Sequence, residues 1–493
     1  MLFNSFTFAI FLPVVFLLYW FVFNRNLRLQ NLFIVVASFV FYAWWDWRFL
    51  FLMTFTSLCS WGSGLLMQLI ESKQIKTPHY LTAKTISVSN IVLNLGVLSV
   101  FKYYHFFVEN FIAAFASLGI HLQPTSLHII LPVGISFYTF HALSYSIDVY
   151  KKRVPATKDM IAFFAFISFF PLLVAGPIER ATNLLPQMYR KRTFDYPKAV
   201  DGMRQILWGL FKKIVIADNC ANIANEIFNN YNDYSGGVLV LGTLFFTFQI
   251  YGDFSGYSDI ALGTARLFGF HVIRNFAFPY FSRDIAEFWR RWHISLTTWF
   301  RDYIYIPLGG SRVSKGKVVR NTFIIFLVSG FWHGANWTFI SWGAYHAILF
   351  LPLILRNKNR KNTNIVAEGK RYPSWKEVFQ MSITFGLVAF GWILFRADNI
   401  ECAGNIILRI FSPSFFIIHS IEDITLQQVA STCFYLLLFM LIEWCGRQNN
   451  YAIETLYKER RTWLRYLFYL ILALITLCYS LTDEVQEFIY FQF

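Results

Sequence analysis

The sequence predicts an all-α membrane protein that crosses the bilayer many times. Of its 493 residues, 56% are hydrophobic and only 14% are charged, and 57 are phenylalanine. Soluble domains average roughly 45–50% apolar and about 25% charged residues, so this composition excludes a soluble globule. The aromatic excess is typical of a surface that meets lipid and two membrane interfaces.

Apolar runs that approach the length of a bilayer crossing, about 20 residues, recur along the chain. They lie at 6–23, 31–45, 48–70, 86–107, 129–147, 160–176, 236–252, 321–332 with 336–354, 376–396, 429–445 and 464–481. We expect roughly 10–12 transmembrane helices in a single domain over residues 1–493. The first run lacks the flanks of a signal peptide, so we expect it to remain as a span.

Glycine and proline interrupt several runs, as in LPVGISFYTF (131–140) and SFFPLLVAGPIER (168–180). Broken helices survive at membrane depth only where protein or a water-filled cavity satisfies the freed backbone groups. The breaks therefore favour a substrate-holding core over a plain bundle. Residues 280–321 mix Trp, Arg, His and Asp too closely for a lipid-facing span. We expect amphipathic and re-entrant helices there, on the cytoplasmic side.

The net charge of +15 is spread over short loops. Basic clusters lie at 151–153, 190–192, 356–362 and 458–465, between apolar runs. This is the positive-inside pattern, whose ordinary partner is anionic lipid. A nucleic-acid partner would need a soluble domain, and none is visible.

Charges at the two ends predict the orientation. Arg25 and Arg28 follow the first run, which puts that loop in the cytoplasm and the N-terminus outside. Acidic residues follow the last run within the C-terminal tail, residues 482–493, so we expect this tail to be extracytoplasmic too. The number of full crossings should then be even.

His333 is the first candidate catalytic residue. It separates two apolar runs and is flanked by Gly330 and Gly334. An ionisable side chain at such depth is a functional hypothesis by default, and imidazole, with an unperturbed pKa of about 6.5, suits general-base work. The glycines would let backbone or substrate approach closely. The alternative is a core histidine satisfied by a carbonyl group.

His293 is the second candidate. In a continuous helix, Trp289, His293 and Thr297 would share one face. Two buried histidines could act as a base and its orienting partner. No H-x-x-H or E-x-x-H spacing accompanies them, so we expect no metal.

The charged residues near these histidines could have either structural or substrate-binding roles. Arginines 283, 290, 291 and 301 are either interfacial anchors or ligands for the phosphates of a nucleotide-like donor. Asp253 and Asp259 lie in an apolar setting and need partners. We expect one of them to pair with an arginine of 283–301, and Asp253 is also a candidate substrate-binding residue.

Seven ordered blocks span almost the whole chain: MLFNSFTF, LPVGISFYTFHALSYSIDVYK, VAGPIERA, DFSGYSDIALG, FWRRWHISLTTWFRDYIYIPLGG, SGFWHGANWTFISWGAYHA and WILFRAD. Together they resemble the membrane-bound O-acyltransferase superfamily, nearest to its alginate and peptidoglycan O-acetylation branch. The resemblance implies a ring of helices around a central tunnel, with 280–347 as the catalytic core segment. It implies that His333 is catalytic and that His293 is the other recurrent histidine.

The same blocks supply the residues expected to bind substrate. These are Arg290, Arg291, Arg301, Asp302, Tyr305, Trp332, Asn336 and Asp253.

The tail ends in FIYFQF, with Tyr490 as its one hydroxyl. In teichoic-acid D-alanylation, a small partner protein with an F-x-Y-F ending is thought to carry the acyl group on tyrosine. The resemblance implies the same catalytic role for Tyr490. The alternative is a passive aromatic anchor at the membrane interface.

These observations predict an O-acyltransferase of the bacterial cytoplasmic membrane. The expected donor is a cytoplasmic thioester, acetyl-CoA, with no bound cofactor. The acetyl group would reach a cell-envelope or exported polysaccharide through a separate periplasmic or extracellular SGNH-type partner. One alternative is D-alanyl transfer to teichoic acid. The other is a transporter or flippase, because such proteins also have polar residues at the membrane midplane and broken helices.

Overall fold

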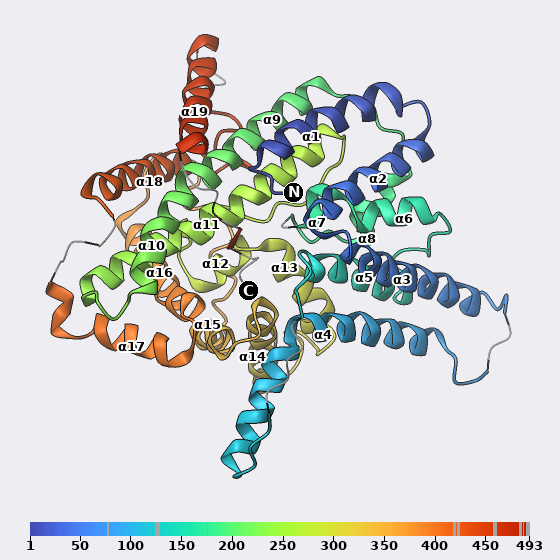
Figure 1. The fold of residues 1–493 in the computed structure, drawn as a ribbon, viewed down its shortest axis with the longest axis horizontal. Helices are drawn as coiled ribbons and strands as arrows, with labels where there is room; N and C mark the ends of the chain where they lie inside the picture. The colour runs from blue at the N-terminus through green and yellow to red at the C-terminus, as the bar shows by residue number, and fades with distance from the viewer. Residues whose placement is uncertain are drawn as a thin grey trace. The chain divides into compact units, whose positions relative to one another are not determined.

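The computed structural model describes residues 1–75, 78–123, 129–174, 176–417, 421, 424–456, 461–482, 486 and 488–489. All regular secondary structure in these ranges is helical (Figure 1), which confirms the all-α prediction. The chain divides into two compact units. Unit 1 comprises Met1–Gly202 and Thr264–Ile273, and unit 2 comprises Met203–Gly263 and Arg274–Phe493. The expected single domain stays a prediction.

Unit 1 holds the N-terminal helices. They are α1 Phe6–Leu17, the π-helix η1 Leu18–Val22, α2 Leu27–Asp46, α3 Phe49–Glu71, α4 Ala83–Ser117, α5 Ile135–Tyr150, α6 Met160–Ile167, α7 Phe170–Leu173 and α8 Ala181–Met188. Helix α3 packs on α4 and α5, and α2 packs on α6. The buried Arg192 guanidinium donates to the side-chain oxygens of Gln30 and Asn31 at the start of α2. Neutral oxygens therefore satisfy this cation inside the unit.

Unit 2 holds most of the remaining helices. They are η2 Phe211–Ala217, α10 Asp218–Asn229, η3 Pro279–Phe281, α12 Ile285–Arg291, α13 Ile294–Phe300, η4 Arg301–Tyr305, α14 Lys315–His333, α15 Trp337–Leu355, α16 Trp375–Arg396, α17 Ile400–Ile410, η5 Pro413–Phe416, α18 Leu426–Gly446 and α19 Thr462–Thr482. Helices α9 Tyr196–Leu210 and α11 Gly236–Leu267 each include a unit boundary.

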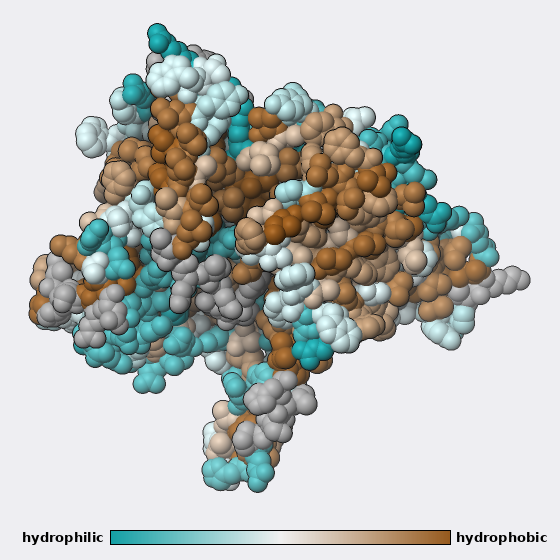
Figure 2. Space-filling view, turned by 45° about the horizontal axis from the view of Figure 1, so that its top comes forward, coloured by the Kyte–Doolittle hydropathy of each residue, from teal (hydrophilic) through white to brown (hydrophobic). Residues whose placement is uncertain are grey.

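Eight described helices are long and apolar enough to cross a membrane: α2, α3, α4, α11, α15, α16, α18 and α19. Their outward residues are apolar, as at Phe55 on α3 and Leu470 on α19, and broad apolar areas cover the face drawn in Figure 2. These features confirm a multi-pass membrane protein. The full number of crossings and their direction stay predictions.

Other predicted runs form shorter helices at the places where glycine and proline occur. The run 129–147 becomes helical only after Gly134, whose φ of 73° is left-handed. The run 160–176 is divided into α6 and the four-residue α7, which has Pro171 in its first turn. Residues 280–321 also form short helices, namely η3, α12, α13, η4 and the start of α14.

Helices α14 and α15 lie side by side in unit 2 (Figure 1) and touch through glycine. A Cβ atom added to Gly330 would lie 2.2 Å from the Phe339 carbonyl oxygen, and one added to Gly343 would lie 2.4 Å from that of Phe326. Only glycine allows such close backbone contact, which is a common device in membrane helix pairs. We expected Gly330 to allow close approach of either backbone or substrate, and the structure shows the backbone of α15 in this place. The contact fixes the end of α14, where His333 lies.

We predict that Gly343→Ala lowers the thermal unfolding temperature of the purified protein in detergent. The new methyl group meets backbone, which cannot rotate away, and overpacking typically costs about 1–3 kcal/mol. The matched control is Gly386→Ala on α16, where an added Cβ has nothing within 4 Å. This control should be neutral or stabilising, because alanine is the better helix former by about 1 kcal/mol. Equal unfolding temperatures for the two variants would contradict the packing argument.

Candidate functional site

A cavity of about 480 Å³ lies in unit 2, within the usual size range of small-molecule sites. Helices α12, α13 and α14 contribute most of its wall, together with η4 and the connector after α15. Both predicted histidines, His293 and His333, line it. The structure therefore brings together two imidazoles that are far apart in the sequence.

His293 lies between α12 and α13, with a φ of 43°. The chain therefore forms no continuous helix through His293, but Trp289, His293 and Thr297 all line the cavity. The chain breaks because residues 275–277 bind it: the Ile294 N–H donates to the Asn275 carbonyl at 2.8 Å, and the Ala277 N–H donates to the Arg291 carbonyl at 3.0 Å. A non-glycine residue in this conformation is strained, and such strain is often found at functional sites.

Asn275 also determines the state of the His293 ring. Its Oδ1 lies 3.2 Å from His293 Nδ1 and accepts hydrogen bonds from the N–H and the hydroxyl of Ser295. Its amide nitrogen donates to the Ser258 hydroxyl, which supports this amide orientation. Nδ1 must then carry the proton, so Nε2 has a lone pair. Burial lowers the pKa of His293 to about 3, so the ring is neutral near pH 7.

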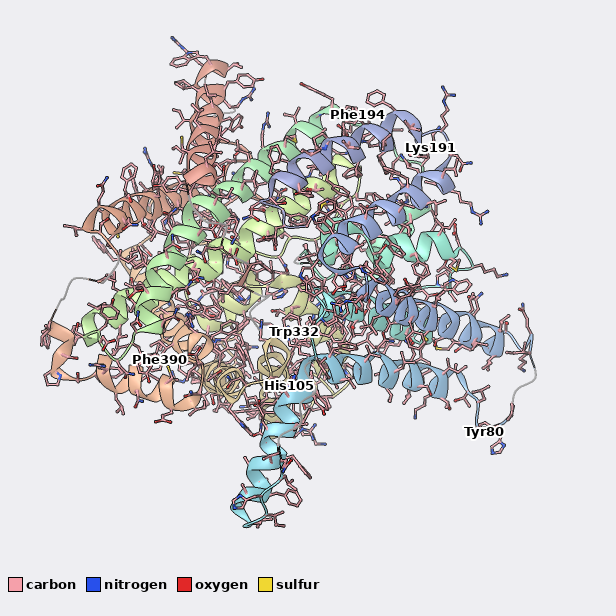
Figure 3. The ribbon with its side chains drawn as sticks, in the orientation of Figure 1. Tyr80, His105, Lys191, Phe194, Trp332 and Phe390 are labelled. Carbon is pink, nitrogen blue, oxygen red and sulfur yellow. The ribbon has the colours of Figure 1, made fainter. Side chains whose placement is uncertain are left out.

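His333 is the last residue of α14 and is 3% exposed. Aromatic rings surround it, with the centroids of Trp342 at 5.2 Å and Phe395 at 5.3 Å. Trp332, labelled in Figure 3, lies 4.8 Å from the His333 ring and 5.9 Å from the His293 ring. Trp332 is thus an aromatic neighbour of both imidazoles, but it is not among the residues that line the cavity.

Two of the four predicted arginines reach the cavity. Arg290 and Arg301 line it, as does Arg360 from the connector after α15. Arg283 and Arg291 instead pair with Glu287 at 3.0 and 2.8 Å and are not lining residues. Glu287 is 1% exposed, so these pairs neutralise a buried carboxylate.

Backbone carbonyls of the same connector hold Arg290. Its guanidinium donates to the carbonyl oxygens of Asn359 at 2.7 Å and Asn362 at 2.6 Å. Among the described residues no carboxylate lies within ion-pair distance of Arg290, although the charges of Asp284 and Glu287 act on it from further away. A cation in this state at the cavity wall favours an anionic ligand.

The remaining predicted binding residues divide into two groups. Tyr305 lines the cavity and shares a hydrogen bond with the Ser311 hydroxyl, and Asp302 binds the Arg301 guanidinium at 2.7 Å. Asn336, by contrast, caps α15 and donates to the Asp398 carbonyl. Asn336 does not line the cavity, and its contacts are those of a structural residue.

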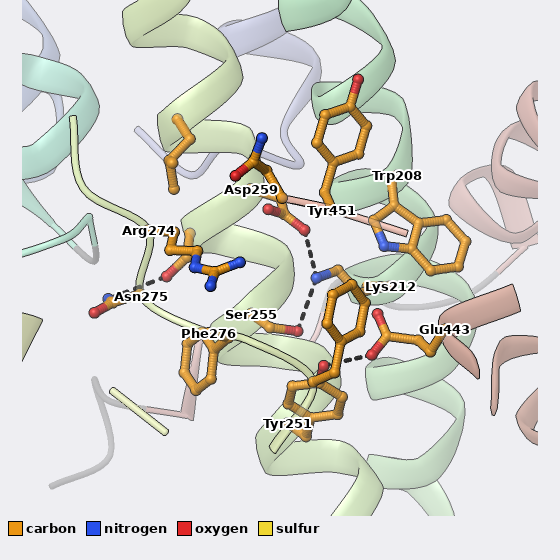
Figure 4. A pocket seen from close by; sticks show the side chains of 14 residues that line it. Trp208, Lys212, Tyr251, Ser255, Asp259, Arg274, Asn275, Phe276, Glu443 and Tyr451 are labelled. Carbon is orange, nitrogen blue, oxygen red and sulfur yellow. Dashed lines mark hydrogen bonds and ion pairs between the residues drawn. The ribbon is translucent and has the colours of Figure 1, made fainter. Parts of the chain in front are cut away.

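The two aspartates of α11 pair with lysines of η2, so the expected arginine partner was wrong. Lys212 lies 2.5 Å from Asp259, and Lys213 lies 2.9 Å from Asp253. Figure 4 shows the first pair in a small polar pocket, where Lys212 also reaches the Ser255 hydroxyl at 2.9 Å. Asp253 does not line the cavity, and besides Lys213 it contacts the C-terminal tail.

Tyr490 lies outside the described residues, but two residues just before it are described. Phe488 and Ile489 are 0% and 2% exposed. The Phe488 ring lies 4.3 Å from that of Tyr257. These two tail residues therefore pack inside the protein and do not form a lipid-facing anchor.

Several residues of the site gave no signal in the sequence. Asn275 sits 18 positions before His293, and an asparagine in a loop has no motif that predicts such a contact. Arg360 belongs to a basic loop, which topology alone explains. Their roles depend on the tertiary fold, so spacing along the chain could not identify them.

Comparison with known proteins places this site in a family. Residues 42–394 match the model of the MBOAT, membrane-bound O-acyltransferase, family. The chain is 41% identical over 414 residues to a probable alginate O-acetylase of Pseudomonas aeruginosa, covering 84% of this chain and 75% of the relative. It is 31% identical over 538 residues to a peptidoglycan O-acetyltransferase of Helicobacter pylori, covering 100% and 98%.

A third relative is more distant. A teichoic acid D-alanyltransferase of Streptococcus thermophilus is 29% identical over 312 residues, covering 59% of this chain and 75% of the relative. The matched family segment contains the cavity's histidines and arginines. The chain therefore belongs to the membrane-bound O-acyltransferase family and is a multi-pass O-acyltransferase.

Proposed function

We propose that this protein takes an acetyl group from acetyl-CoA in the cytoplasm and passes it across the membrane for O-acetylation of a cell-envelope or exported polysaccharide. The observation that carries the proposal is that one cavity holds both imidazoles together with the guanidinium groups of Arg290, Arg301 and Arg360. The relatives named for alginate and peptidoglycan O-acetylation support the acetyl group and the polymer class.

The mixed polar and apolar lining of the cavity suits the donor. Arg290, Arg301 and Arg360 line one cavity with apolar side chains such as Phe300 and Ile325. Guanidinium groups bind phosphates through paired charged hydrogen bonds, and apolar walls suit the thin pantetheine chain. The donor's thioester would then lie toward the two histidines.

The proposed chemistry is one acyl transfer. His333 removes the proton from an acceptor hydroxyl, and the oxygen attacks the thioester carbonyl carbon. The carbon–sulfur bond breaks, the C–O ester bond forms, and the proton on His333 passes to the departing thiolate. His293 orients the acceptor, because its Nε2 lone pair can accept a hydrogen bond from that hydroxyl.

The proposed acceptor is the Tyr490 phenol. Tyr490 directly follows Ile489, and one chain step is about 3.8 Å. Phe488 lies 6.0 Å from Phe254, whose ring is 4.6 Å from that of His293. This chain of contacts supports a tail directed toward the site. An acetyl-tyrosine ester is activated compared with an alkyl ester, so an extracytoplasmic SGNH-type partner could transfer it to sugar hydroxyls.

We predict that His333→Ala lowers acetyl transfer by about 10²–10⁴-fold, as loss of a general acid–base residue does. The assay is acetate content of the exported polymer in cells that express each variant at equal level. Normal size-exclusion behaviour of the variant shows that it folds. Near-normal polymer acetylation by a folded His333→Ala protein would refute the assignment.

Asn275→Leu should lower kcat by at least about tenfold with little change in KM for acetyl-CoA, since a wrong histidine tautomer costs about 10⁴ in serine proteases. Leucine cannot accept a hydrogen bond from the Nδ1–H group, so His293 is free to adopt the other tautomer. Asn275→Asp keeps an acceptor and should retain more activity, while its charge moves the pH profile upward. Identical kcat and pH profiles for all three proteins would show that Asn275 has no part in positioning His293.

Tyr490→Phe removes one oxygen and should abolish polymer acetylation without lowering expression. The matched control is Tyr466→Phe, which removes the same atom from an exposed side chain on α19 and should leave acetylation unchanged. Full activity of Tyr490→Phe would remove tyrosine from the mechanism.

A further inference from the structure

Part of the C-terminal tail is held in unit 2 by contacts with its backbone. Lys213 Nζ donates to the Gln486 carbonyl oxygen at 3.1 Å, and the Ile489 N–H donates to Asp253 Oδ2 at 2.7 Å. One contact uses a carbonyl group and the other an N–H group three residues later. This pair of contacts fixes both the direction and the register of the tail.

The two residues that hold the tail are buried and charged. Lys213 and Asp253 are 1% and 2% exposed, and Lys213 also binds Asp218 at 2.7 Å. One ammonium group thus faces two buried carboxylates. A buried carboxylate is stabilised by additional hydrogen-bond donors, and the Ile489 N–H is one.

An aromatic pocket adjoins these charges. Asp253, Phe254 and Tyr257 all lie on α11, and the buried Phe488 ring packs against both aromatic residues. The Gln486 side chain donates to Asn222 on α10 at 3.1 Å. The tail is therefore bound by α10, η2 and α11 together, through one deeply buried ring and several hydrogen bonds.

We propose that Lys213, Asp253 and the Phe254–Tyr257 pair form a peptide-binding site that docks the C-terminal tail beside His293. Its ligand is a peptide with an aromatic residue followed by a residue that has a backbone N–H. Lys213 and Asp253 are positioning residues, because they hold the tail and do not line the cavity. The purpose of the docking rests on the proposed acyl transfer to the tail, but the docking itself does not.

The chain supplies matched variants on both sides of this contact. Ile489→Pro removes the N–H that Asp253 accepts, whereas Ile489→Ala keeps it. Lys213→Met removes the ammonium group that binds the tail. Its control is Lys212→Met, which removes the neighbouring buried ammonium group of Figure 4. That group binds Asp259 and Ser255, whereas the Lys213 ammonium group binds Gln486 of the tail.

The test is hydrogen–deuterium exchange of the full-length protein in detergent, read by mass spectrometry on the C-terminal peptide. Wild type, Ile489→Ala and Lys212→Met should show slow exchange there. Ile489→Pro and Lys213→Met should exchange at least tenfold faster in this peptide only. If Lys213→Met does not fold, the two tail variants decide the matter alone, because both shorten the same buried side chain and keep Lys213 and Asp253, and only Ile489→Pro removes the N–H.

Three results would overturn the docking site: fast exchange of the wild-type tail, unchanged protection in Ile489→Pro, or equal loss of protection in Lys212→Met and Lys213→Met. Failure of the proposed function looks different. In that case Tyr490→Phe keeps full acetylation while Ile489→Pro still releases the tail.

Discussion

A charge that is buried in a membrane protein must find its partner inside the protein, and in unit 2 this constraint organises the structure. The paired lysines of η2 meet the paired aspartates of α11, Lys212 with Asp259 and Lys213 with Asp253. These ion pairs fix η2 against α11. Asp253 then holds the tail on one side of α11, and Phe254, the next residue, contacts His293. Packing, tail and candidate site are therefore linked through one helix.

The same constraint separates structural from functional arginines. Arg283 and Arg291 share the buried Glu287 and stabilise the core. Arg290 has carbonyl partners at the cavity wall, which satisfy its hydrogen bonds but not its charge. For the proposed acetyl-CoA donor, which carries several phosphates, a cation of the second kind is the one suited to binding. These arginines lie within about eight positions of one another, and they differ in role because of the groups that tertiary structure places beside them.

The sequence predicted the fold class and the family, but it did not predict the contacts that depend on tertiary structure. Composition and apolar runs correctly predicted an all-α multi-pass protein, and the motif blocks identified the family and the two histidines that meet in the cavity. Periodicity failed at His293, since a backbone hydrogen bond from Ile294 to a residue far earlier in the chain breaks the helix there. The partners of Asp253 and Asp259 were wrong for a related reason: lysines in a π-helical turn gave no cue that they would face α11. Burial of Phe488 could not be read from a terminal segment whose aromatic residues equally suit a membrane interface.

Central to the proposed function is the passage of the acyl group through this cavity onto the chain's own tail. Its most direct test is to incubate the purified protein with acetyl-CoA carrying a ¹³C-labelled acetyl group and to map the label by peptide mass spectrometry. We predict a labelled ester on the C-terminal peptide of the wild type and none on that of His333→Ala. Label released only as free acetate, or an unlabelled C-terminal peptide in protein that still acetylates polymer, would contradict the account.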